Sequence, residues 1–101
     1  MAISSVEAPD GKRVTIEISG RFDFGAHQDF SKVFRQYPRG GRAFVVDLSN
    51  TDYMDSSALG MLLQLRDYSD RAAGGVTLAN SNAGIREILR IANFEKLFTI
   101  T

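Results

Sequence analysis

Residues 43–48 read Ala-Phe-Val-Val-Asp-Leu, and this short apolar run decides the fold class. A strand that is apolar on both faces is typical of the centre of a parallel sheet, where helices pack on each side of it. A helical pattern follows from Ser56 to about Arg71, and Gly74-Gly75 is expected to close it. A strand that leads into a helix is the repeating unit of an α/β domain.

Two strands and one helix are predicted on the N-terminal side of this run. Ile3 to Ala8 forms a weak strand, and the turn at Pro9-Asp10-Gly11 is expected to pair it with a second strand over residues 13–19, where apolar and polar residues alternate. Residues 20–25 then form a loop. Apolar residues recur at helical spacing from Ala26 to Tyr37, which predicts one helix with a buried stripe.

The C-terminal part adds a strand over residues 76–79, a helix over residues 85–92 that Asn82 can cap, and a short strand over residues 97–100. The resulting order, β-β-α-β-α-β-α-β, predicts an α/β fold with a mixed, mostly parallel sheet covered by helices. The length of 101 residues fits one domain spanning residues 1–101.

The composition excludes several classes of function. Twelve basic and twelve acidic side chains cancel, so the chain lacks the basic surplus that nucleic-acid binders carry. Cysteine is absent and His27 is the only histidine, which argues against thiol catalysis, disulfide scaffolds and Cys- or multi-His metal sites. We therefore expect no metal, no cofactor and no enzymatic activity.

The sequence also predicts a location. The first residues show no signal-peptide pattern, and the longest nearly apolar stretch, residues 58–63, is far shorter than the roughly 20 residues that cross a bilayer. The expected location is the cytoplasm, with no membrane partner.

The loop over residues 49–57 is expected to hold the functional residues, because ligands of open α/β sheets bind at the carboxyl ends of the strands. Acidic residues gather at this loop, namely Asp47, Asp52 and Asp55, with Asp23 expected from the neighbouring loop. The hydroxyls of Ser56 and Ser57 lie at the positive end of the following helix. The helix dipole favours a phosphate there, while the carboxylates oppose it.

The helix after this loop is expected to present a bare outer face. A helical wheel directs one set of residues to the core, namely Ala58, Leu59, Leu62, Leu63 and Leu65. It directs another set to solvent, namely Gly60, Gln64, Asp67 and Arg71. An exposed glycine costs a helix roughly 0.5–1 kcal/mol, so Gly60 indicates close approach by another backbone or by a neighbour within the domain. Met61 and Leu63 are expected at the margins of the core-facing arc, partly available to a partner.

Residues 53–60, Tyr-Met-Asp-Ser-Ser-Ala-Leu-Gly, resemble the phosphorylation-site motif of bacterial anti-sigma factor antagonists, the single-domain members of the STAS family. The resemblance extends over nearly the whole chain. It includes the segments Gly20-Arg21-Phe22-Asp23, Val45–Ser49, Leu78-Ala79-Asn80, Ile88-Leu89 and Leu97-Phe98. Ala58 stands where many members carry glycine.

The resemblance implies a function. Such proteins, when unphosphorylated, bind an anti-sigma factor and free its sigma factor. The partner is often an ATP-using serine kinase that phosphorylates the serine after the aspartate, here Ser56 with Ser57 as the alternative, and a PP2C-type phosphatase reverses the reaction. The implied surroundings of the phosphosite and partner surface are Asp23, Asp55, Ser57, Gly60, Met61 and Gln64.

Two other functions fit parts of the sequence. Asp47 ends an apolar strand as the phospho-accepting aspartate of a receiver domain would, but the acidic pair and late lysine of receivers are not in place. A STAS domain without a switch, serving in a transport or scaffold complex, would need no phospho-acceptor, and the intact Asp55-Ser56-Ser57 argues against it.

Two residue groupings have ordinary interpretations. His27 and Asp23 are four residues apart, as in some metal pairs, but a solvent-facing histidine in the first turn of a helix is the favoured interpretation. Phenylalanines gather in this part of the chain, at positions 22, 24, 30 and 34. Their spacing is interpreted as core packing.

Overall fold

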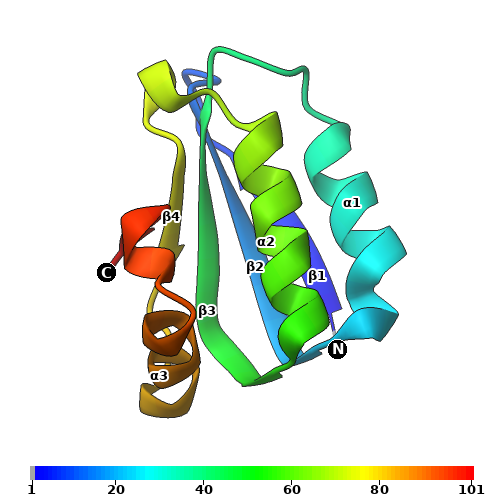
Figure 1. Cartoon of the computed structure of the whole chain (residues 1–101). Helices are drawn as coiled ribbons and strands as arrows, with labels where there is room; N and C mark the ends of the chain where they lie inside the picture. The colour runs from blue at the N-terminus through cyan, green and yellow to red at the C-terminus, as the bar shows by residue number, and fades with distance from the viewer. Residues whose placement is uncertain (1) are drawn as a thin grey trace.

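In the computed structural model, which describes residues 2–101, the chain begins with the predicted hairpin (Figure 1). Strand β1 (Ala2–Glu7) pairs antiparallel with β2 (Arg13–Phe22). The turn between them closes through a hydrogen bond from the Gly11 N–H to the Ala8 carbonyl at 2.9 Å. Gly11 has a φ of +70°, a conformation that glycine adopts at little cost.

The remaining strands add to this hairpin in parallel. They are β3 (Ala43–Met54), β4 (Val76–Ala79) and β5 (Thr99–Ile100), and the sheet order is β1-β2-β3-β4-β5. The predicted mixed, mostly parallel sheet is confirmed. Only two residues of the strand predicted at 97–100 pair with β4, because the preceding residues form a 3-10 turn.

Three α-helices connect the parallel strands. They are α1 (His27–Arg35), α2 (Ser56–Tyr68) and α3 (Ala83–Ile91). Short 3-10 turns precede α1 and follow α2 and α3, and they are η1 (Phe24–Ala26), η2 (Arg71–Ala73) and η3 (Phe94–Lys96). In Figure 1, α1 and α2 lie side by side in front of the sheet.

The helices bury one face of the sheet. The side chains of Val14, Phe44 and Val76 are register partners on three neighbouring strands, and all three are buried in the single core to which each helix contributes. Their chain neighbours Thr15 and Val45 point to the other face and remain only half-buried. The prediction that residues 43–48 are buried on both faces is therefore wrong. One face of this strand lies in the core and the other is only half-buried, although most of its residues are apolar.

Strand β3 is much longer than predicted, because residues 49–54 continue the strand instead of forming a loop. Between the rungs that join Glu17 to Asp47 and Phe22 to Met54, β3 contains two more residues than β2. These β-bulges, one beside Gly20, let the strand bend without losing its pairing. The predicted loop over residues 20–25 is likewise strand as far as Phe22.

A hydrogen bond from the buried side chain of Thr51 stabilises the bulged segment of β3. The buried Thr51 hydroxyl donates a hydrogen bond to the Ile18 carbonyl at 2.7 Å. A buried hydroxyl without a partner would be destabilising, so this bond explains how a polar residue is accommodated under the helices.

Helix α2 ends at Tyr68, three residues before the predicted Arg71. Ser69 has an extended backbone, with ψ near 166°, and its N–H donates to the Leu65 carbonyl at 2.9 Å. The Asp70 side chain then accepts a bond from the Ala72 N–H and begins η2, which Gly74 closes at a φ of +125°. The short capping bonds of Ser69 and Asp70 replace the last turn of the predicted helix.

Candidate functional site

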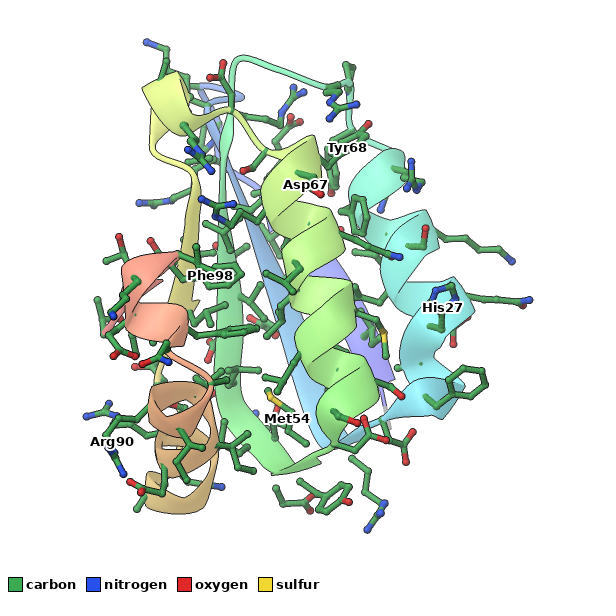
Figure 2. The ribbon with its side chains drawn as sticks, viewed as in Figure 1. His27, Met54, Asp67, Tyr68, Arg90 and Phe98 are labelled. Carbon is green, nitrogen blue, oxygen red and sulfur yellow. The ribbon has the colours of Figure 1, made fainter. Side chains whose placement is uncertain are left out.

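The site is built where β2 and β3 end together. Phe22 and Met54 are register partners, and the Asp55 N–H donates to the Phe22 carbonyl at 3.4 Å. Asp23 and Asp55 are the next residues of their strands, so the pairing brings both to the same edge of the sheet. Figure 2 shows Met54 at this end of the molecule, away from Asp67 and Tyr68. The expected proximity of the two loops is confirmed.

Both aspartates have structural roles at this edge. The Asp55 side chain is the N-cap of α2 and accepts a hydrogen bond from the Ala58 N–H at 3.0 Å. The Asp23 side chain caps η1 by accepting from the Gly25 N–H at 3.0 Å. Asp23 also lies 3.5 Å from the Arg21 guanidinium, an exposed pair that contributes little to stability. The carboxylates are therefore fixed in place without being buried.

Ser56 and Ser57 occupy the first two positions of α2 but differ in exposure. The Ser56 side chain is exposed to solvent, whereas Ser57 is half-buried. An enzyme that modifies a hydroxyl must reach it, so the two serines are not equivalent. The dipole of a 13-residue helix adds a positive field at both positions.

The outer face of α2 begins one turn after Ser56. Gly60 is exposed, and a Cβ added to it would meet no atom within 4 Å. No packing neighbour within residues 2–101 therefore explains this glycine. Gln64, one turn further along, is also exposed and extends the same face.

Two expectations about this helix need correction. Met61 is only 2% exposed and belongs to the core, so it offers no surface to a partner. Leu63, placed in the core-facing set but also expected to keep part of its surface available, is 37% exposed, which agrees with the second expectation, and Leu59 is half-buried. The buried stripe runs through Ala58, Met61 and Leu65, at spacings of three and four, so the true core arc is rotated away from Leu63.

Exposed aromatic residues at the site were missed by the sequence interpretation. Phe24, expected in the core, is 73% exposed beside His27, with the two ring centroids 6.3 Å apart. Tyr53 is 41% exposed, and the Arg21 guanidinium lies 4.0 Å from the centre of its ring. The available signal was spacing, because Phe24 does not fit the helical stripe that runs through Ala26 and Phe30.

Asp47 does not belong to this site. It lies eight residues before Asp55, on a strand that rises about 3.3 Å per residue, so roughly 25 Å of chain separates them. The Ser49 N–H donates to its carboxylate, and this bond lowers the pKa of Asp47, with a further contribution from Asn80. The prediction that Asp47 crowds the helix start is wrong because residues 47–54 are extended.

The described chain offers little for other chemistry. Residues 2–101 contain no group of three or more His, Asp or Glu side chains arranged to hold a metal ion. His27 is exposed at the first position of α1, as the favoured interpretation predicted. Within the same residues, no helix has the length and apolar character needed to span a membrane.

Comparison with known proteins places this geometry in a family. A family model described as "Mlab, STAS domain" matches residues 5–99. A STAS-domain containing protein of Pseudomonas aeruginosa (strain UCBPP-PA14) is 50% identical over 101 residues, which is the full length of both chains.

Solved structures share the fold at low identity. The anti-sigma factor antagonist SpoIIAA in its unphosphorylated form is 18% identical with a TM-score of 0.70, and the alignment covers 99% of this chain and 87% of that one. The phosphorylated form of this Bacillus cell fate determinant is 19% identical with a TM-score of 0.65, covering 99% and 91%. A sulfate transporter family protein of Wolinella succinogenes is 16% identical with a TM-score of 0.70, covering 89% and 78%. The five-stranded mixed sheet, its helices and these matches show that the chain belongs to the STAS domain family.

Proposed function

We propose that this protein is an anti-sigma factor antagonist whose partner binding is switched off by phosphorylation of Ser56. The observation that carries the proposal is the exposed Ser56 hydroxyl at the start of α2, one turn from the bare backbone at Gly60. In this proposal the protein acts in the cytoplasm as a kinase substrate and is not itself an enzyme.

The surface around Ser56 suits a protein partner. Phe24, Tyr53 and Leu63 expose apolar side chains on three different segments, η1, β3 and α2. Aromatic residues are enriched among the side chains that dominate binding energy at interfaces. The bare glycine lets a partner backbone approach the helix closely. A snug, partly apolar contact of this kind is sensitive to an added charge.

The surroundings of Ser56 favour disruption by phosphate. A phosphoserine adds about −1.5 to −2 charges. The fixed carboxylates of Asp23 and Asp55 lie at the same edge, and the guanidinium of Arg21 is already paired with Asp23. The phosphate therefore gains little from its own domain and remains free to repel a partner.

The proposed modification is a phosphoryl transfer that the partner catalyses. The Ser56 hydroxyl oxygen forms a bond to the γ-phosphorus of ATP, the bond from that phosphorus to the bridging oxygen breaks, and ADP leaves while the hydroxyl proton passes to a base of the kinase. The anti-sigma factor, as a serine kinase, supplies the nucleotide site. A PP2C-type phosphatase would restore the hydroxyl by hydrolysis.

The experiment is phosphopeptide mass spectrometry on protein isolated from its host, combined with affinity capture of partners. We expect phosphate on Ser56, loss of phosphorylation in Ser56→Ala with partner binding retained, and continued phosphorylation in Ser57→Ala. Ser57→Ala is the matched control, because it removes the neighbouring hydroxyl from the same helix end. Phosphate on Ser57 in the natural protein would overturn the assignment.

A second candidate is a STAS subunit of a transport assembly that lacks the switch. The fold shared with a sulfate transporter family protein favours it. It predicts that membrane-transport components are captured and that Ser56 carries no phosphate. The same capture and mass spectrometry therefore separate the two functions.

A further inference from the structure

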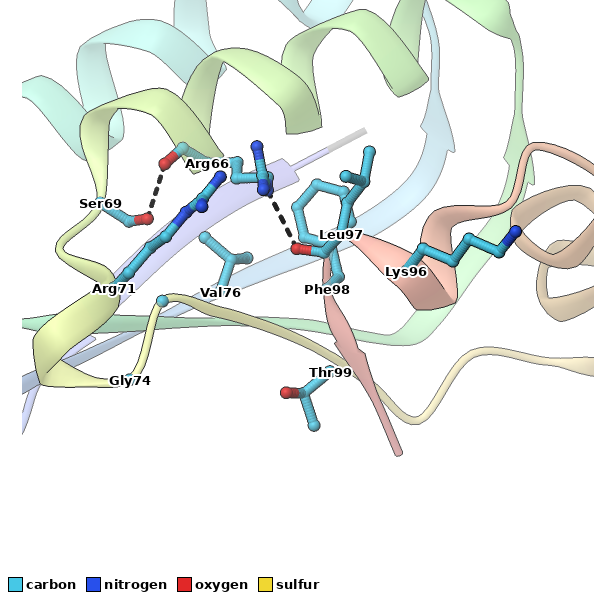
Figure 3. A pocket seen from close by; sticks show the side chains of 10 residues that line it. Arg66, Ser69, Arg71, Gly74, Val76, Lys96, Leu97, Phe98 and Thr99 are labelled. Atoms are coloured by element: carbon cyan, nitrogen blue, oxygen red, sulfur yellow. Dashed lines mark hydrogen bonds between the residues drawn. The ribbon is translucent and has the colours of Figure 1, made fainter.

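A second surface feature lies at the other end of α2, where a pocket of about 310 Å³ opens beside its last turn (Figure 3). Its walls come from the end of α2, from η2 and the turn that follows, and from the segment between η3 and β5. The side chains of Val76 and Phe98, both almost fully buried, form part of its lining. The pocket is separated from Ser56 by the length of α2, about 20 Å for 13 residues.

Basic side chains line this pocket without any acidic one. Arg66, Arg71 and Lys96 are among the lining residues, and no aspartate or glutamate is. Each of the three ion pairs formed within residues 2–101 involves other side chains. The lining therefore carries an excess of positive charge, although Lys96 extends away from Arg66 and Arg71 in Figure 3, and an anion beside the two guanidinium groups would be stabilised.

Helix capping does not account for these cations. The last carbonyls of a helix attract basic side chains, but here they already have partners. Ser69 donates its N–H to the Leu65 carbonyl and its hydroxyl to the Arg66 carbonyl, at 2.9 and 2.7 Å. Arg39, from outside the pocket, donates to the Asp67 carbonyl. The cations are left with unused hydrogen-bond donors.

Arg66 is held in position for a ligand. Its Nε donates to the Leu97 carbonyl at 3.0 Å, and this bond ties the guanidinium to the segment before β5 (Figure 3). The terminal nitrogens of Arg66 remain available. The positive charge of these side chains attracts a phosphate dianion, and guanidinium recognises phosphate oxygens in a bidentate manner.

We propose that this pocket binds the phosphate group of a phosphomonoester, with an adjoining apolar part of the ligand resting against the exposed side chain of Leu97. The site is independent of Ser56 and of the proposed switch. The phosphate can belong to a small soluble molecule or to a lipid headgroup such as phosphatidic acid, because both present the same dianion.

Phenyl phosphate is a suitable soluble probe, since it joins a phosphate dianion to an apolar ring. We expect saturable amide shifts confined to residues 71–76 and 96–99 when ¹⁵N-labelled protein is titrated at constant ionic strength. The double variant Arg71→Gln/Lys96→Gln should raise the Kd at least tenfold. Arg13→Gln/Lys32→Gln removes the same charge from exposed positions elsewhere and should change the Kd less than twofold.

A second arm measures cosedimentation with phosphatidylcholine vesicles that contain phosphatidic acid or lack it. If the protein binds phenyl phosphate and the pocket variant weakens this binding, the result supports a soluble ligand. Binding only to phosphatidic acid vesicles, weakened by the same variant, supports a headgroup. Binding that both double variants weaken equally, or no binding in either arm, overturns the proposal. Melting curves of all variants verify that each remains folded.

Discussion

The two ends of helix α2 are built in opposite ways. At the Tyr68 end, the tyrosine hydroxyl donates to the Tyr37 carbonyl, and the guanidinium groups of Arg35 and Arg39 lie 5.6 and 5.5 Å from the centre of the Tyr68 ring. At the Ser56 end, one capping bond from Asp55 holds the helix start, and the exposed side chains around it have few partners.

The difference indicates that the Tyr68 end of α2 contributes more to the stability of the domain than the Ser56 end. The Tyr68 end ties α1, α2 and the following turn together, since the Asp70 carboxylate also accepts from the Gly41 N–H at 2.9 Å. The Ser56 end leaves the apolar side chains of Phe24 and Tyr53 and the backbone of Gly60 exposed to solvent. Exposed apolar surface of this kind is typical of interaction sites. Substitutions at the two ends should therefore affect different measurements.

The largest effect is expected for Tyr68→Ala, which should lower the free energy of unfolding by about 3 kcal/mol. The change removes the hydrogen bond to Tyr37 and the aromatic contacts with Phe34 and Phe44. Urea denaturation measures it. Phe24→Ala is the matched aromatic control at the other end, and its effect should stay within about 0.5 kcal/mol. Equal losses in the two variants would remove the contrast between the ends.

Gly60→Arg should weaken partner binding at least a hundredfold, or about 2.7 kcal/mol, by filling the space that a partner backbone needs. The domain should remain folded, because Gly60 is exposed and an added Cβ would meet no atom within 4 Å. Affinity is measured by titration calorimetry once the partner is in hand, with the melting temperature as control. Unchanged affinity in a folded variant would place the interface elsewhere.

Ser56→Asp should weaken partner binding by at least tenfold, or about 1.4 kcal/mol, since it adds one charge beside Asp23 and Asp55. A carboxylate at a helix N-terminus is favoured by about 0.3–1 kcal/mol, so the fold should be unaffected. Calorimetry of the natural protein, Ser56→Ala and Ser56→Asp tests it, with circular dichroism for folding. Equal affinities would exclude a charge switch, and tighter binding by the aspartate would reverse its polarity.

The smallest effect concerns Asp47, which lies away from both ends of α2. Hydrogen bonds from Ser49 hold the folded pKa of Asp47 below its ordinary value of 3.8. A lowered folded pKa contributes stability that is present above pH 3.8 and is lost as the pH falls through the folded pKa. Between pH 6 and 3, the natural protein should lose slightly more stability than Asp47→Asn in urea denaturation. A larger loss in the variant would contradict this.

The sequence predicted the order of the elements because each has a local signature. The hairpin turn, the alternation in β2 and the cap at Asn82 depend on neighbouring residues alone, and all are present in the structure. The positions of Asp23 and Ser56 at one end of the sheet also followed from strand order, because parallel strands end at a common edge, whereas the exposure of Gly60 followed from the helical wheel.

The errors arose where distant pairing overrides local composition. Residues 49–54 are mostly polar and were predicted to form a loop, yet they pair with the end of β2. The β-bulges in this pairing depend on the register with the neighbouring strand, which the local sequence does not contain. Met61 and Leu63 differ in exposure because the buried positions of α2 follow the spacings of three and four that join Ala58, Met61 and Leu65, and the predicted core arc was centred too close to Leu63. Phe24 was assigned to the core because the sequence does not show that β2 ends at Phe22 and that a 3-10 turn begins at Phe24.

The two extra residues in β3 impose a constraint of a different kind. The irregularities fall at Leu48-Ser49 and at Asp52, and the side chains of Ser49 and Asp52 are exposed, so many residue types would serve at these two positions. Their number is fixed, however, because removing one would turn Met54 from the core to solvent and shift the start of α2 relative to Asp23. Relatives that keep the same constellation at the start of α2 should therefore vary freely in the chemistry of this stretch while keeping its length, so insertions and deletions should be rarer here than substitutions.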